Sequence, residues 1–542
     1  MFKVTKAWIQ TRRQQRSPDW RRLGLVALAV SLLSGGVSQA QLQTSAARVG
    51  NALPSLGDGL ELAAVTERRL GDRIAMSIYR DPDYLDDPLL GDYLKAIWTP
   101  LMAAARDRGE LGPELEDRFA WDLLLVRDRS VNAFALPGGY MGVHTGLIAV
   151  VSSADELAAV LAHELSHVTQ RHISRLMTKQ QQQTPWVIGA MILGALAASK
   201  NPDAANAAIV GGQALAVQGQ LNFSRDMERE ADRVGFGVMT QAGFEGQGVS
   251  GMFEKLQQAA RLNDNGSYPY LRSHPLTTER IAEARARLQM GEPAAQSRSP
   301  LFDLEPQLHA MMSARARVLG SPGVDDLRSM VAEGQRAATE SVAQEKLPFW
   351  AGRVYGGAFA ASRLREDATA LALLARLKSV AVQTPGAART ADLLSIELET
   401  AAGRPHEAAA AVKFSQVTTR AELLIGGRAM MAAGLLDPLA DALQTWVVTH
   451  PKDAQAWQML SEVWGRKGEA VRSIRADAES RVAQLDYPAA LDRLKAAQDM
   501  LRGGQAGVAG RNAHIDASII DSRTRQISNL IREQTREDKI DR

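Results

Sequence analysis

The residue types best suited to chemistry in this chain lie together in the segment 163–167, which reads HELSH. In a helix, positions i and i+4 lie on one face, one turn apart, so His163 and His167 can bind the same metal ion. Glu164 projects beside such a metal, where its carboxylate can accept a proton from a water molecule. The chain has nine histidines, and this pattern arises by accident in roughly one shuffled sequence in a hundred. A hydrolytic metal site is therefore predicted, with an exposed helix carrying two incidental histidines as the alternative.

A second segment, 224–232 (SRDMEREAD), can complete the metal site. Hydrolytic zinc sites use three protein ligands and leave one position open for water. The chain has no cysteine, so the third ligand has to be a histidine or a carboxylate. We predict Glu228 as this ligand and Asp232, one turn later, as the acceptor of a hydrogen bond from a ligand imidazole. Glu230 is the rival ligand, on a helix face roughly 200° away.

A capped helix is predicted to carry the first two ligands. Ser153 can cap the free N–H groups at the start of this helix, and Glu156 can reach back to complete a capping box. From Leu157 to about Met177 the chain has no Pro or Gly. We therefore expect one helix over this whole stretch.

The elements before this helix indicate a small sheet. Apolar spacing predicts a helix over residues 87–107, and the apolar run 121–126 is typical of a strand. A turn is predicted at 137–139 (PGG), followed by the apolar segment 140–151. A small sheet that leads into the motif helix follows from this order.

Two apolar segments follow the motif helix, 186–198 and 204–217, and each is too short to span a membrane. Asn201-Pro202-Asp203 separates them, so we expect a helical hairpin. The hairpin is interpreted as a lid over the site, as a membrane-leaning element or as a buried core hairpin. Residues 293–300 are expected to be a linker.

The chain after this linker is helix-patterned and contains a weak repeat. The positions that fit a 34-residue tetratricopeptide register are Gly434, Pro451, Trp457, Trp464 and Gly468. Helix pairs of this kind stack into a solenoid with a concave binding surface. We therefore predict a helical repeat domain over 301–542, with a plain helical bundle as the alternative.

The N-terminus has the features of an export signal. Residues 1–40 contain seven Lys or Arg and one acid, and an apolar core of eleven residues, Leu23 to Leu33, follows the basic stretch. Small residues before and at Ala40 fit a signal peptidase site, so we predict cleavage after about Ala40, with an uncleaved anchor as the alternative. The remaining chain has a net charge of about −4, which gives no reason to expect nucleic-acid binding.

The two segments together resemble the gluzincin metallopeptidases of the HtpX and CAAX-prenyl-protease type, in which HExxH is followed on a later helix by ExxxD. His163, Glu164, His167, Glu228 and Asp232 match this pattern residue by residue. The resemblance is closest to a soluble periplasmic branch that joins this domain to tetratricopeptide repeats. It implies one Zn²⁺ per chain and a mainly α fold with a small β-sheet. A metallopeptidase domain over 41–292 would be followed by the helical solenoid.

Two further segments match the family. The resemblance implies that an edge strand pairs with the substrate backbone, with an ordinary core strand as the alternative. The residues of this strand are Asn132, Ala133, Phe134 and Ala135. It also implies that His274 or Arg280 donates to the oxyanion of the tetrahedral intermediate. In the repeat-bearing branch, a histidine such as His274 can instead occupy the fourth metal position and hold the enzyme inactive. His144 and His172 are interpreted as structural or solvent-facing.

The resemblance implies a zinc-dependent endopeptidase of the periplasm that acts in quality control and assembly of outer-membrane proteins. Its expected partners are misfolded or stalled outer-membrane proteins and, through the repeats, the outer-membrane assembly machinery. We expect no nucleic acid and at most peripheral membrane contact. The alternative is a periplasmic chaperone or assembly factor whose zinc site is structural or silenced.

Overall fold

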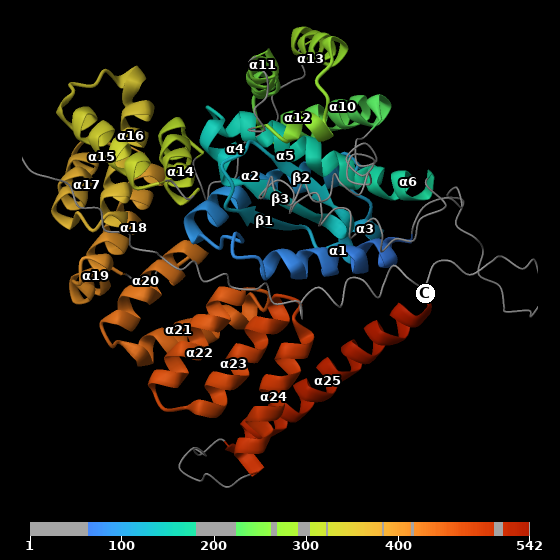
Figure 1. Ribbon diagram of the computed structural model, residues 1–542, viewed down its shortest axis with the longest axis vertical. Helices are drawn as coiled ribbons and strands as arrows, with labels where there is room; N and C mark the ends of the chain where they lie inside the picture. Colours follow the sequence, from blue (N-terminus) through green and yellow to red (C-terminus); the bar gives the residue numbers. More distant parts are fainter. Residues whose placement is uncertain are drawn as a thin grey trace, which may run out of the picture. The chain divides into compact units, whose positions relative to one another are not determined.

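The computed structural model describes residues 63–179, 224–261, 268–290, 304–320, 323–381, 384–412, 417–502 and 513–540. The predicted signal at 1–40, the hairpin at 186–217 and the linker at 293–300 lie outside these ranges. The described chain is mainly α-helical with one small sheet, as expected (Figure 1).

The first half of the described chain combines the sheet with most of the short helices. Its elements are α1 (Ala64–Tyr79), α2 (Pro88–Asp107), α3 (Pro113–Arg118), β1 (Asp122–Val126), β2 (Ala133–Leu136), the 3-10 turn η2 (Pro137–Gly139), β3 (Tyr140–His144), α4 (Thr145–Val150), α5 (Ala154–Thr169), α6 (His172–Lys179), α10 (Arg225–Gln241), α11 (Gln247–Arg261), α12 (Tyr270–Ser273) and α13 (Thr278–Met290). The helix expected at 87–107 and the strand expected at 121–126 are thus confirmed as α2 and β1.

The sheet has the strand order β1-β3-β2, with β1 parallel and β2 antiparallel to β3. Its side chains alternate between two faces. Leu124 and Tyr140 pack with Ile74 of α1 on one face, whereas Leu125 and Met141 belong to the core on the other face, where α2 and α5 lie (Figure 1). β2 is an edge strand, and α5 packs against it. The sheet therefore presents its edge to the helix that carries the HELSH motif.

The start of α5 follows the predicted cap. The Ser153 side chain accepts the N–H of Glu156 at 3.2 Å, which confirms Ser153 as the N-cap. The Glu156 carboxylate accepts the N–H of Ser152 at 2.7 Å, one residue before the position that a capping box uses. Both interactions satisfy N–H groups that the helix itself cannot pair, so the start of α5 is firmly fixed.

The prediction of one helix from Leu157 to Met177 is wrong, because α5 ends at Thr169 and α6 begins at His172. Arg171 between them has a φ of 55°, in the left-handed region that interrupts a helix. Its guanidinium lies 2.8 Å from the buried carboxylate of Glu67 in α1. This tertiary ion pair, together with the turn, redirects the chain at a point where the local sequence favours helix.

Helix α10 begins with a cap and packs closely against α5. The Ser224 side chain accepts the N–H of Met227 at 3.3 Å. Farther along, a Cβ atom added at Gly235 would lie 3.0 Å from the carbonyl oxygen of Ala162. The absence of a side chain at Gly235 therefore lets the two helix backbones approach each other. This close approach places the acidic residues of α10 beside the HELSH motif.

The second half of the described chain is entirely helical apart from turns. Its helices are α14 (Pro306–Leu319), α15 (Val324–Thr339), the 3-10 turn η3 (Gln344–Lys346), α16 (Leu347–Arg363), α17 (Asp367–Ala381), α18 (Pro385–Ala401), α19 (Pro405–Ala410), α20 (Arg420–Ala432), α21 (Leu436–Thr449), α22 (Ala454–Arg466), α23 (Ala470–Ala483), α24 (Tyr487–Arg502) and α25 (Ala513–Ile540). Helices α20 to α25 pack each against the next. Gly434 and Gly468 lie in turns with φ of 77° and 79°, which a glycine adopts without strain. This arrangement agrees with the predicted solenoid of helix pairs.

Two arginines of the helical half bind adjacent aspartates before α2. Arg315 of α14 is 1% exposed and lies between Asp87, at 2.7 Å, and Glu397 of α18, at 2.7 Å. Arg420 of α20 binds the Asp86 carboxylate at 2.6 and 2.8 Å. A buried guanidinium needs such partners, because burial removes the water that would otherwise hydrate its charge. These contacts join the helical half directly to the helix that packs on α5.

A third contact between the two halves, from a carboxylate to a backbone N–H group, predicts a pH effect on stability. The Asp92 carboxylate of α2 accepts the N–H of Ala421 at 2.9 Å, and burial raises the pKa of Asp92 to about 6. The folded state therefore binds this proton more tightly than the unfolded chain does. The stabilisation that this proton gives to the folded state is complete below pH 3.8 and is lost as pH rises through about 6.

We expect Asp92→Asn to gain free energy of unfolding relative to the wild type as pH rises from 4 to 7. The gain over this range should reach about 2 kcal/mol, because the amide oxygen keeps the Ala421 contact without a buried charge. Chemical denaturation of both proteins across this pH range measures the difference. A constant difference would show that the carboxyl group titrates normally.

Candidate metal centre

The predicted metal ligands of α5 face one another and are buried. His163 and His167 are 6% and 0% exposed, and their Nε2 atoms lie 3.0 Å apart. Both rings point from α5 toward α10, because positions four apart share one face of the helix. The geometry predicted from the HELSH spacing is therefore present in the structure.

The carboxylate of Glu228 lies against both imidazoles. Its Oε2 atom is 3.5 Å from His163 Nε2, and its Oε1 atom is 3.5 Å from His167 Nε2. Glu230, the rival ligand, projects elsewhere and is 3.0 Å from His172 Nε2. The structure therefore brings Glu228, and not Glu230, to the two histidines of α5.

His274 completes the cluster from a distant part of the chain. It follows the short helix α12 and is 2% exposed. Its Nδ1 atom lies 3.0 Å from Glu228 Oε1 and 3.3 Å from His163 Nε2. Four residues thus offer one ligand atom each, and these four atoms all lie within 4.8 Å of one another: His163, His167, Glu228 and His274.

The donor set fits a tetrahedral metal ion. Zinc binds imidazole nitrogen and carboxylate oxygen at about 2.0–2.2 Å, so two ligand atoms at the tetrahedral angle are about 3.3–3.6 Å apart. The nearest donor atoms, counting both Glu228 oxygens, are 3.0 to 3.5 Å apart, and the four ligand atoms all lie within 4.8 Å of one another. Three imidazoles and one carboxylate are ligands that zinc commonly takes. The four residues could therefore hold a divalent metal.

The charges of the cluster also suit a cation. Burial alone raises the pKa of Glu228, but His274 and His163 outweigh it and hold the pKa of Glu228 well below its usual range. Burial lowers the pKa of His167 well below its ordinary value. The pKa of His163 is raised to about 10, because its contacts with Asp232 and Glu228 outweigh burial. A metal ion that binds here must therefore displace a proton from His163.

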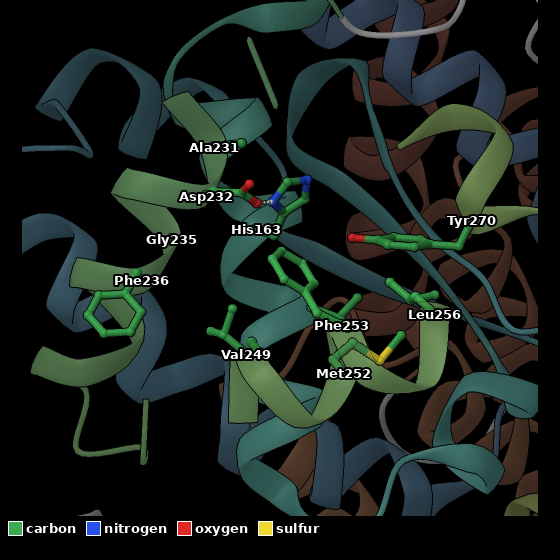
Figure 2. A pocket seen from close by; sticks show the side chains of 12 residues that line it. His163, Ala231, Asp232, Gly235, Phe236, Val249, Met252, Phe253, Leu256 and Tyr270 are labelled. Carbon is green, nitrogen blue, oxygen red and sulfur yellow. Dashed lines mark ion pairs between the residues drawn. The ribbon is translucent and has the colours of Figure 1, made fainter. Parts of the chain in front are cut away.

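Asp232 lies behind His163, where the sequence places a hydrogen-bond acceptor for a ligand imidazole. Its Oδ1 atom is 3.0 Å from His163 Nδ1 (Figure 2). The Arg280 guanidinium forms two hydrogen bonds to Asp232, at 2.6 and 2.8 Å, and its Nη1 atom lies 2.8 Å from Glu228 Oε2. Burial raises the pKa of Asp232, but Arg280 and His163 outweigh it and lower that pKa. Arg280 therefore contacts the acidic residues of α10.

The carboxylate of Glu164 bridges the edge strand and His274. Its Oε2 atom accepts the N–H of Ala135 in β2 at 3.0 Å. Its Oε1 atom is buried and makes no hydrogen bond with the described residues, although His274 Nε2 lies 3.3 Å away. Glu164 is thus beside the metal cluster without belonging to it.

The predicted substrate segment 132–135 borders this carboxylate. Ala133, Phe134 and Ala135 lie in edge strand β2, and Asn132 precedes it. The carbonyl of Asn132 accepts the N–H of His144 at 3.1 Å, which continues the pairing with β3. An extended peptide could be aligned by the other side of this strand.

A buried histidine, interpreted from the sequence as structural or solvent-facing, also contacts the cluster. His172, at the start of α6, is 0% exposed, and its Nδ1 atom lies 2.9 Å from Nδ1 of His167. The sequence signal for this contact is the position of His172 five residues after His167. In an unbroken helix, however, that spacing would place His172 on another face. His144, by contrast, is buried beside Ser130, 2.9 Å away, and takes no part in the cluster.

An apolar pocket adjoins the other side of His163. The pocket holds about 370 Å³ of empty space, part of it open to solvent, and lies between α5, α10 and α11. Figure 2 shows Val249, Met252 and Phe253 of α11 near His163, with Tyr270 opposite. This wall places apolar atoms against one face of His163.

Among the described residues, no helix has the length and apolar character to cross a bilayer.

The comparisons with known proteins agree with this geometry. Residues 104–288, which contain all four cluster residues, match the model of peptidase family M48. The chain is 28% identical over 505 residues to a beta-barrel assembly-enhancing protease of Yersinia pestis, which covers 90% of this chain and 96% of that protein. A similarly named protein of Vibrio cholerae is 34% identical over 276 residues, 50% of this chain and 53% of its own length.

A mitochondrial metalloendopeptidase, OMA1 of Arabidopsis thaliana, is 34% identical over 156 residues, 29% of each chain. The likeness to this protein is thus confined to part of the chain, whereas the likeness to the Yersinia pestis protein extends through the helical half. Residues 104–288 are therefore similar to metallopeptidases of family M48, and the chain as a whole resembles the beta-barrel assembly-enhancing proteases.

Proposed function

We propose that this protein is a zinc-dependent endopeptidase of the periplasm. The observation that carries the proposal is the buried cluster of three imidazoles and one carboxylate with a second carboxylate, Glu164, beside it. Structural zinc sites are closed by their ligands and need no such neighbouring base. Zinc is preferred over harder metals because three of the four donors are imidazole nitrogens.

The residues around the cluster suit peptide hydrolysis. A bound zinc ion would lower the pKa of a water molecule toward about 7 and polarise the scissile carbonyl. Glu164 accepts the proton of the attacking water and passes it to the leaving nitrogen. The edge of β2 aligns the substrate backbone through main-chain hydrogen bonds. To bind in this way, a substrate replaces Glu164 as the partner of the Ala135 N–H.

His274 is proposed to restrain the enzyme in its resting state. Its Nδ1 atom lies at the distance of a fourth ligand from Glu228 and His163, and its Nε2 atom faces Glu164. A histidine in this position excludes the attacking water. When it moves away, His274 is free to donate to the oxyanion. Arg280, the other oxyanion candidate, has its donors directed at Asp232, Glu228 and the carbonyl of Pro275.

The proposed setting follows from the relatives and the N-terminus. The names of these relatives connect them with β-barrel assembly, so misfolded or stalled outer-membrane proteins are the proposed substrates. Residues 1–40 are proposed as a signal that is cleaved after about Ala40. The peptidase domain is proposed to span 41–292, and the repeats over 301–542 are proposed to bind the assembly machinery. A chaperone with a silenced zinc site is the competing function.

Casein degradation by the purified mature protein tests the enzyme proposal. We expect a chelator to stop cleavage and added zinc to restore it. We expect His274→Ala to cleave casein at least about 10-fold faster than the wild type, because the open metal position is then accessible to water. His406→Ala, at an exposed histidine of α19, is the matched control and should behave as the wild type.

Zinc content is measured for each protein in the same experiment. Cleavage that persists without metal would contradict the proposal. If neither the wild type nor His274→Ala cleaves casein although each binds zinc one to one, the chaperone function is favoured. A slower His274→Ala would instead assign His274 to oxyanion stabilisation.

A further inference from the structure

Each of the two imidazoles on α5 has a partner on its outer nitrogen, and the two partners differ. His163 Nδ1 faces the carboxylate of Asp232, which belongs to the family pattern (Figure 2). His167 Nδ1 faces another imidazole, Nδ1 of His172, at 2.9 Å. His172 Nε2 in turn lies 3.0 Å from Glu230 Oε2. The same oxygen accepts a hydrogen bond from Arg175 Nη1 at 2.9 Å.

The break between α5 and α6 creates this row of side chains. In a continuous helix, two residues five positions apart point roughly 140° away from each other, so their rings cannot meet. The positive φ of Arg171 separates α5 from α6, and the centroids of the His172 and His167 rings lie 4.9 Å apart. Arg171 is held in this turn by Glu67. The departure from regular helix thus has a direct consequence at the cluster.

The hydrogen bonds of the row define one arrangement of protons. A metal bound at His167 Nε2 takes the lone pair of that nitrogen, so neutral His167 carries its proton on Nδ1. That proton can be donated only if His172 Nδ1 is an acceptor, which puts the proton of neutral His172 on Nε2. The Nε2–H group then donates to the Glu230 carboxylate, which Arg175 also holds. Each bond in the row fixes the direction of the next.

We propose that His172 and Glu230 are positioning residues for the metal centre, which together fix the tautomer and the ring orientation of the ligand His167. This inference rests on the proposed metal centre and adds to it a second support, separate from Asp232. His172 accepts the Nδ1–H of His167 and thereby directs Nε2 at the metal. Glu230 keeps His172 in the accepting tautomer. Neither residue touches the substrate or the reacting water.

The competing explanation is that His172 only fills space, since it is 0% exposed. Two substitutions separate the explanations. His172→Leu keeps most of the volume and removes the acceptor. His172→Asn removes volume and keeps an acceptor oxygen near the place of Nδ1. A space-filling role predicts that Leu is the better replacement, whereas a positioning role predicts Asn.

The measured quantity is the zinc affinity of the full mature chain, by competition with a chromophoric chelator. We expect His172→Leu to bind zinc about 10–100-fold more weakly than the wild type and His172→Asn to remain within about threefold. At Glu230, which is partly exposed, we expect Glu230→Met to lose about threefold to 10-fold and Glu230→Gln to bind as the wild type does. With Co²⁺ in place of zinc, His172→Leu should show a shifted visible absorption band and His172→Asn should not.

Circular dichroism of the metal-free proteins shows whether each variant folds. If His172→Leu does not fold, the pair Glu230→Met and Glu230→Gln decides the question at a more exposed site. Equal zinc affinity of Leu and wild type, or an Asn variant as weak as Leu, would overturn the positioning role. A wild type that binds no zinc would remove the metal centre itself. If all variants bind zinc with the affinity of the wild type, only the positioning role of His172 and Glu230 is removed and the metal centre stands.

Discussion

Glu164→Gln is expected to abolish casein cleavage while zinc remains bound. Glu164 lies next to the four clustered residues but is not one of them, so its replacement leaves the donor set intact. The amide can still accept the Ala135 N–H, which Glu164 Oε2 accepts at 3.0 Å in the structure. It cannot accept the proton of the attacking water. We expect a loss of at least about 10²–10⁴-fold in rate, the range that a positioned general base contributes.

The measurement combines casein degradation with zinc content per chain. It is best made in the His274→Ala background, in which the proposed restraint is absent and the rate of the parent protein is expected to be largest. Glu254→Gln, an exposed position of α11, applies the same chemical change away from the cluster and should leave the rate unchanged. A Glu164→Gln protein that cleaves casein at the parent rate would rule out Glu164 as the base.

Glu228→Ala is expected to release the metal, with zinc affinity reduced by more than about 100-fold. This exceeds the effect of losing a residue that only supports a ligand, because Glu228 itself supplies a donor atom. Its carboxylate is 3.5 Å from both His163 Nε2 and His167 Nε2. Without it, Arg280 Nη1 also loses the carboxylate that lies 2.8 Å away, and the guanidinium keeps only Asp232 and the carbonyl of Pro275 as partners. The stabilisation that zinc gives to the folded state should therefore be lost as well.

Glu230→Ala is the matched control, two residues along the same helix. Its carboxylate contacts His172 and Arg175 rather than the cluster, so its loss should weaken zinc binding only about threefold to 10-fold. Zinc content and the zinc-dependent rise of the unfolding temperature, compared for both variants, measure the effects. If Glu230→Ala loses the metal and Glu228→Ala keeps it, the third ligand is Glu230.

The part of the site that depends on local structure could be predicted from the sequence. The positions of His163 and His167 on one face follow from helix geometry, and Ser153 marks the start of that helix. The same reasoning relates Glu228 to Asp232, one turn apart on α10. The short strands and the glycine turns of the repeats also depend on neighbours in sequence. Periodicity and capping are sufficient for such features because few residues determine them.

The remaining features depend on contacts between distant parts of the chain. The end of α5 at Thr169 could not be foreseen, because the stretch has no Pro or Gly and the turn at Arg171 is held by Glu67, far earlier in the sequence. His172 meets His167 only as a result of that turn. His274 likewise reaches the cluster through the packing of α12 rather than through its spacing. Because long-range packing can override local helix preference, only the folded chain reveals how these residues surround the metal centre.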